Sequence, residues 1–90
     1  MENFKNEIRS MLEEIIFICE DNEIAYNDAT LYDIAFEGAG SFSFHNDIDC
    51  DDLPDDLIEM ADDIYDLFIG KIPDYEVRKE IMDEIIDSMN

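Results

Sequence analysis

The sequence predicts an α+β fold: an N-terminal helix, a small antiparallel β-hairpin or three-stranded sheet, and two C-terminal helices, in one acidic domain over residues 1–90. Three observations lead to this prediction. Apolar residues recur at helical spacing near both ends of the chain. They alternate with polar residues in the middle, where two glycines mark a turn. Two prolines stand at the starts of the last two apolar stripes, where a helix tolerates proline best.

The first predicted helix covers residues 3–20, because its apolar residues are three or four positions apart. Phe17 points away from that stripe, so either a neighbouring segment covers it or it contacts a partner. The stripe consists of Phe4, Ile8, Met11, Leu12, Ile15, Ile18 and Cys19.

The predicted hairpin lies between residues 30 and 45, where the apolar period changes to two. Gly38 and Gly40 bracket its turn, and residues 23–27 are compatible with a third, short strand. The inward positions of the two strands would be Tyr32, Ile34 and Phe36, then Phe42 and Phe44.

Two helices are predicted after the hairpin. One covers about residues 53–69, with Pro54 in its first turn and Gly70 at its end. The other covers about residues 73–88 and begins at Pro73. Its buried stripe would be Val77, Ile81, Ile85 and Met89.

The charge is extreme for a chain of this size. There are 26 acidic residues against five basic ones, a net charge of −21, although 47% of the residues are hydrophobic and indicate a folded protein. From residue 10 to residue 70 there is no Lys or Arg, and eighteen of the acids fall there. This charge disfavours direct binding to nucleic acid or to an anionic membrane and favours a basic partner.

The remaining composition indicates a cytoplasmic protein. The N-terminal segment interleaves Glu with its apolar residues, unlike a signal peptide, and the longest apolar run, residues 15–19, is too short to span a bilayer. Cys19 and Cys50 stand in unrelated contexts without a CxxC spacing, so they are expected to be reduced thiols.

Residues 47–66 hold ten carboxylates without a single Lys or Arg. A calcium loop is excluded, because its sixth position is Asp52 instead of Gly and its twelfth is Ile58 instead of Glu. Catalysis is not expected either: no nucleophile or base accompanies the acids, and His45 lies on the polar face of the predicted hairpin. We therefore expect no enzyme activity, no metal site and no cofactor.

The helical wheel of the predicted second helix separates its acids from its apolar residues. Its six acids span an arc of roughly 120° and a rise of about 16 Å, or about one charge per 3.3 Å, close to the roughly 3.4 Å spacing of one DNA strand. Five of the six are Asp, although Glu with Lys four positions later would make a better helix. These acids are Asp55, Asp56, Glu59, Asp62, Asp63 and Asp66.

In size, charge and this base-free middle, the chain resembles the small acidic DNA-mimic proteins of phages and mobile elements, which include anti-CRISPR proteins and inhibitors of restriction enzymes or uracil-DNA glycosylase. The resemblance implies an inhibitor that occupies the nucleic-acid groove of a basic defence protein in the bacterial cytoplasm, such as a CRISPR effector or a restriction enzyme. The expected partner-binding residues are Asp47, Asp49, Asp51, Asp52, Asp55, Asp56, Glu59, Asp62, Asp63 and Asp66.

Other interpretations stay open at this point. A small acidic adaptor or regulator would bind a basic protein away from any nucleic-acid site, and a halophile-like surface would have no specific partner. The uneven placement of the bases argues against the second of these. Phe17 and the aromatic face of the hairpin also leave room for a homodimer.

Overall fold

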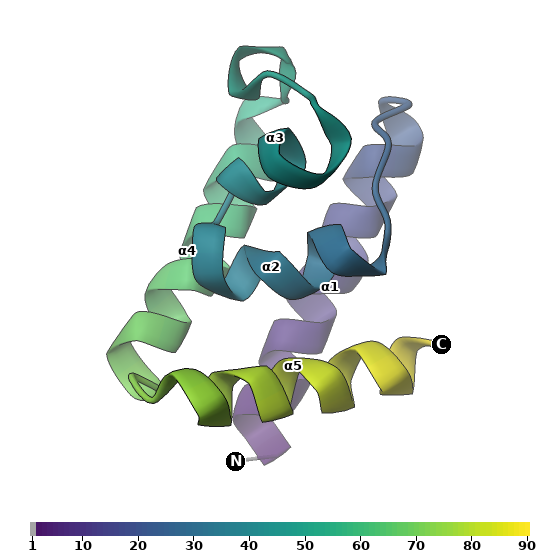
Figure 1. The fold of residues 1–90 in the computed structure, drawn as a ribbon. Coiled ribbons are helices and arrows are strands. Elements are labelled where there is room, and N and C mark those ends of the chain that lie inside the picture. Colours follow the sequence, from purple (N-terminus) through teal and green to yellow (C-terminus); the bar gives the residue numbers. More distant parts are fainter. Residues whose placement is uncertain (1) are drawn as a thin grey trace.

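The computed structural model describes residues 2–90, and within them the fold is all-helical, with no β-strand (Figure 1). The predicted α+β class is therefore wrong. The elements are α1 (Glu2–Asp21), α2 (Asp28–Glu37), α3 (Gly40–Asn46), the 3-10 helix η1 (Cys50–Asp52), α4 (Asp55–Lys71) and α5 (Tyr75–Met89).

Helices α1 and α4 run antiparallel at the back of Figure 1, and α2 and α5 cross in front of them. The rings of Phe4 and Phe68 meet edge to face with centroids 5.1 Å apart, so the start of α1 packs on the end of α4. One core of buried aliphatic and aromatic residues lies between these layers. The radius of gyration is 12.1 Å, close to the ~12 Å expected for a folded domain of this length.

Residues 28–46 form two helices instead of the predicted hairpin. Asn27 caps α2: its side chain accepts from the Thr30 N–H at 2.9 Å, and the Thr30 hydroxyl accepts from the Asn27 N–H at 3.2 Å. Leu31, Ile34 and Ala35 are buried at helical spacing. The alternating aromatics fit this helix as well as a strand, and the reciprocal cap favours the helix.

The connections also differ from the prediction. Gly38, at φ +58°, ends α2 and turns the chain into α3, instead of forming a hairpin turn. The predicted third strand is absent, because residues 24–27 form an irregular link between α1 and α2.

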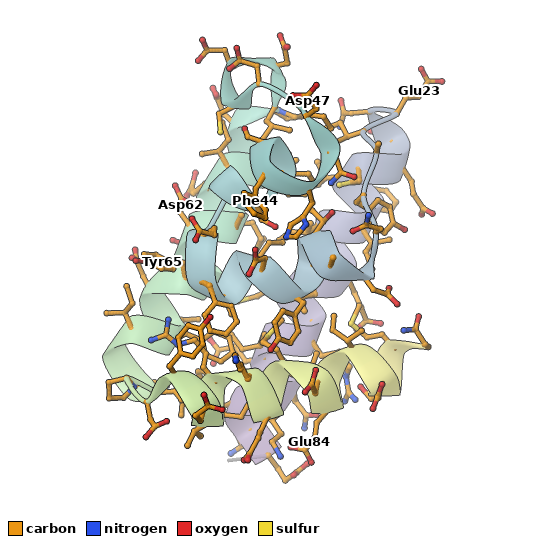
Figure 2. The ribbon with its side chains drawn as sticks, viewed as in Figure 1. Glu23, Phe44, Asp47, Asp62, Tyr65 and Glu84 are labelled. Carbon is orange, nitrogen blue, oxygen red and sulfur yellow. The ribbon has the colours of Figure 1, made fainter. Side chains whose placement is uncertain are left out.

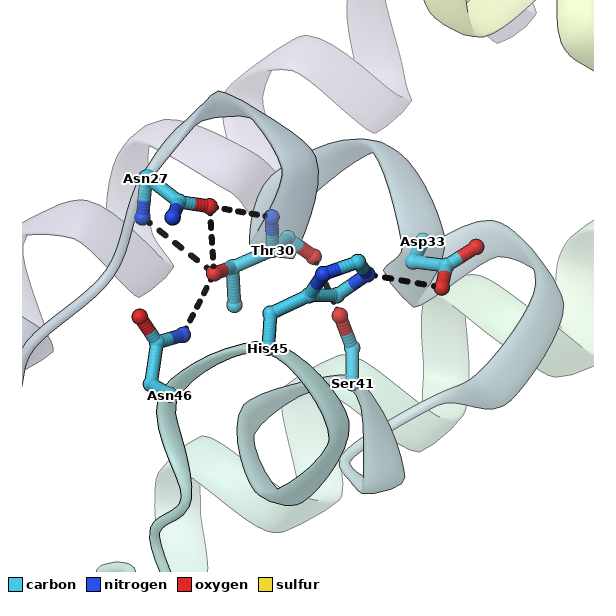
Figure 3. Close-up of polar contacts among 6 residues, drawn as sticks. All are labelled: Asn27, Thr30, Asp33, Ser41, His45 and Asn46. Atoms are coloured by element: carbon cyan, nitrogen blue, oxygen red, sulfur yellow. Dashed lines mark hydrogen bonds and ion pairs between the residues drawn. The ribbon is translucent and has the colours of Figure 1, made fainter.

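A polar cluster holds α3 against α2 (Figure 3). The buried Ser41 hydroxyl donates to the Thr30 carbonyl at 2.6 Å, and the Asn46 amide donates to the Thr30 hydroxyl. His45 Nε2 lies 2.9 Å from a carboxylate oxygen of Asp33. Because Thr30 and Ser41 are fully buried, these hydrogen bonds remove the cost of burying their hydroxyls.

The last two helices are confirmed with shifted boundaries. Helix α4 continues through Gly70, so the predicted end there is wrong, and α5 is capped by the Asp74 carboxylate, which accepts from two backbone N–H groups. Val77 is 38% exposed and does not belong to the buried stripe, in contrast to Ile81 and Ile85. Within residues 2–90, no helix combines the length and apolar character needed to cross a membrane.

Candidate functional site

All ten expected partner-binding carboxylates are exposed, and they follow one continuous path. Asp47 ends α3, three others lie in the following loop and η1, and six lie on α4. Figure 2 labels Asp47 near the top of the molecule and Asp62 on α4, toward its left side. We call this path, from Asp47 to Asp66, the acidic face.

No carboxylate of the acidic face has a basic side chain from residues 2–90 within 4 Å. The ion pairs of the described residues lie elsewhere. Lys5 pairs with Glu84 at 2.6 Å, a hydrogen bond that raises the pKa of Lys5, and Lys79 lies 3.9 Å from Glu76. The negative charge of the acidic face is therefore not neutralised by ion pairing within the described chain.

The five bases lie on the first half of α1, at the end of α4 and on α5, and these segments meet in the lower part of Figure 1. Arg9 donates to Asn6 and Ser88, and the Lys71 ammonium lies over the ring of Phe4 at 5.6 Å. Arg78 has a structural role, since its guanidinium donates to the carbonyls of Ile72 and Ala35. These bases lie apart from the Asp47 end of the acidic face, whereas Asp63 and Asp66 lie near the start of α1.

Several aspartates of the acidic face have a local structural reason to be aspartate. Asp49 caps η1 by accepting from the Asp51 N–H at 3.1 Å. Asp47 has φ +54°, a left-handed conformation that Asp tolerates better than Glu. Asp55 and Asp56 occupy the first turn of α4, where the helix dipole favours negative charge.

Asp62 also supports the fold. Its carboxylate reaches from α4 to the turn between α2 and α3 and accepts from the Ala39 N–H at 3.1 Å. The other aspartates of the acidic face have no such role in the structure. These are Asp51, Asp52, Asp63 and Asp66.

The tertiary structure adds one acid that sequence reasoning missed. Glu7 of α1 lines a groove of about 380 Å³ together with Asp63 and Asp66 of α4, and Met11 and Leu67 are its apolar lining. Nothing in the local sequence around Glu7 indicates this, because the contact depends on how α1 packs on α4.

The polar cluster of Figure 3 is not a catalytic triad. Ser41 donates to the Thr30 carbonyl and not to His45, so the pair of His45 and Asp33 has no activated hydroxyl from Ser41. The contact between Asp33 and His45 instead joins α2 to α3.

Cys19 and Cys50 are free thiols, and Cys19 is fully buried. Burial, with a smaller contribution from the charge of Glu20, raises the pKa of Cys19 to about 11, so this thiol is protonated and unreactive at neutral pH. Phe17 is 64% exposed and lines a second groove, of about 680 Å³, between α1 and the end of α5. Of the two alternatives for Phe17, cover by a neighbouring segment is therefore wrong, and contact with a partner stays a prediction.

Comparison with known proteins does not place the chain in a class: no family model, no curated protein and no solved structure matches it.

Proposed function

We propose that this protein is a DNA-mimic inhibitor that occupies the nucleic-acid-binding groove of a bacterial defence protein, such as a CRISPR effector. The observation that carries the proposal is the acidic face itself, in which ten exposed carboxylates have no basic partner among residues 2–90. A surface selected only for solubility gains from interspersed bases, which reduce self-repulsion. An uninterrupted face instead favours binding to a groove that is rich in Lys and Arg.

The regular placement of the carboxylates supports the same function. Six of them project from one helix over about 16 Å, and Asp49 and Asp62 accept hydrogen bonds from the backbone N–H groups of Asp51 and Ala39. Charges at regular positions along a helix match a protein surface that normally reads the regular phosphates of DNA.

The experiment has two stages. The tagged protein captures its partner from a bacterial lysate, and elution with increasing NaCl measures the electrostatic part of binding. Double-stranded oligonucleotide is then added to the purified complex. Displacement by the oligonucleotide is the expected result, whereas an acidic adaptor would remain bound because it uses another surface of its partner.

Charge reversal locates the contact. The variant Asp51→Lys/Asp52→Lys/Glu59→Lys changes three carboxylates for which the structure shows no role in the fold, and we expect it to weaken binding by about 100-fold or more. The matched control reverses Glu13, Glu20 and Glu23, which are exposed and lie outside the acidic face. Equal losses in both variants, or binding insensitive to salt, would contradict DNA mimicry.

A further inference from the structure

The groove between α1 and α4 has features that the rest of the acidic face lacks. It is a shallow, open groove of about 380 Å³. Met11 and Leu67 are partly buried and pack against the core, whereas Glu7, Asp63 and Asp66 are exposed. An occupant therefore meets both apolar surface and exposed carboxylates.

None of the three carboxylates forms an ion pair with a base of residues 2–90. Lys71 belongs to the same helix as Leu67 and lies one turn beyond it, but its ammonium rests over the ring of Phe4. Asp49 and Asp62 accept hydrogen bonds from backbone N–H groups, whereas Asp63 and Asp66 accept none. A role in the fold therefore does not account for an aspartate at positions 63 and 66.

The carboxylates of the groove are not arranged as metal ligands. In residues 2–90, no three His, Cys, Asp or Glu side chains stand close enough together to hold a metal ion. A cation with several donors on one extended head can contact carboxylates that are not gathered around a single point. It must also carry an apolar part to cover Met11 and Leu67.

We propose that the groove receives a single arginine side chain of the basic partner, a proposal that rests on the proposed function for the identity of that partner. The arginine methylenes lie on Met11 and Leu67, and the guanidinium lies among Glu7, Asp63 and Asp66. Arginine fits better than lysine because its planar head has five donors in a fixed fork and is more weakly hydrated than an ammonium.

The test uses the protein alone with a capped tripeptide that has arginine at its centre. Methyl groups of Met and Leu are followed by NMR during the titration. We expect saturable shifts at Met11 and Leu67 and none at Met82, which is fully buried in the core. The same peptide with citrulline, which keeps the shape but has no charge, should cause no shift, and the lysine peptide should bind at least about threefold more weakly.

Two matched variants locate the site. Glu7→Gln/Asp63→Asn/Asp66→Asn removes the groove carboxylates, and Glu13→Gln/Glu14→Gln/Glu20→Gln removes three exposed acids of α1 that lie outside both the groove and the acidic face. We expect the first variant to lose about tenfold or more in affinity for the arginine peptide and the second less than about threefold. Circular dichroism checks that both remain helical.

Equal losses in the two variants, or equal shifts with arginine, lysine and citrulline, would overturn the arginine site. This result is independent of the oligonucleotide experiment, since the peptide assay contains no DNA-binding protein. DNA mimicry can therefore fail while the groove still selects arginine, and the groove can fail while oligonucleotide still displaces the inhibitor.

Discussion

Replacing Gly38 by alanine places a methyl group where the structure has no space for it. The added Cβ would lie 2.5 Å from the carboxylate oxygen of Asp62, and Gly38 has φ +58° and ψ −138°. Residues with a side chain rarely adopt that backbone conformation. The substitution therefore strains the turn between α2 and α3 and also disturbs one carboxylate of the acidic face.

The cost has two parts. A non-glycine residue in such a conformation costs about 1–3 kcal/mol. To avoid the methyl group, Asp62 must rotate away and lose its hydrogen bond from the Ala39 N–H, which is worth about 1 kcal/mol. The sum of about 2–4 kcal/mol lowers Tm by at least about 8 °C, at ~4–8 °C per kcal/mol for a domain of this size.

Urea and thermal denaturation followed by far-UV circular dichroism measure the effect. Gly70→Ala is the matched control, because Gly70 is inside α4 and an added Cβ would meet no atom within 4 Å. Alanine there should raise the free energy of unfolding by about 0.5–1 kcal/mol. In the Asp62→Ala background, Gly38→Ala should cost about 1 kcal/mol less than in the native chain.

Two outcomes would refute this reasoning. If Gly38→Ala were no more destabilising than Gly70→Ala, the turn would not have the described conformation. If its cost were the same with and without Asp62, the contact between these residues would not exist. A destabilising Gly70→Ala would in turn show that α4 ends at Gly70, as the sequence suggested.

Three further predictions concern the caps and the core. Asn27→Ala removes the α2 cap and should lower the free energy of unfolding by about 1 kcal/mol in urea, and an unchanged urea midpoint would contradict the capping box. Arg78→Met removes the hydrogen bonds to the carbonyls of Ile72 and Ala35 and should cost about 2 kcal/mol, measured in the same way, whereas a cost near zero would mean that the guanidinium is solvated. Because the folded pKa of Cys19 is about 11, against an ordinary 9.0, the folded state holds its proton more tightly, so stability should fall as pH rises between these values. Lys5, Tyr26 and Tyr32 add to this fall, and the Cys19 share is identified by a shallower pH dependence in Cys19→Ala; identical slopes would contradict it.

The three long helices could be predicted from the sequence because each has a wide apolar arc. In α1, the stripe from Phe4 to Cys19 repeats at helical spacing over about four turns, and no other period explains it. Residues 30–45 are ambiguous, since Ile34 belongs both to an alternating pattern and to a helical one with Leu31. The cap of Asn27 and Thr30 was the local signal that could have identified α2.

The acidic face could be predicted in part. The ten carboxylates and the absence of nearby bases follow from composition and order along the chain, because residues close in sequence on one helix stay close in space. The roles of Asp62 and Glu7 could not be predicted. Asp62 contacts a turn 23 residues away, and Glu7 joins Asp63 and Asp66 only because α1 packs antiparallel to α4.

The sequence by itself determined the helical ends of this protein, its strong negative charge and the face on which α4 carries that charge. These properties depend on local periodicity and composition, which need no knowledge of distant contacts. Only the tertiary structure decided that the middle of the chain is helical, that some aspartates hold the fold, and that an acidic groove with an apolar lining lies between α1 and α4. Each of these depends on side chains far apart in the sequence that packing brings together.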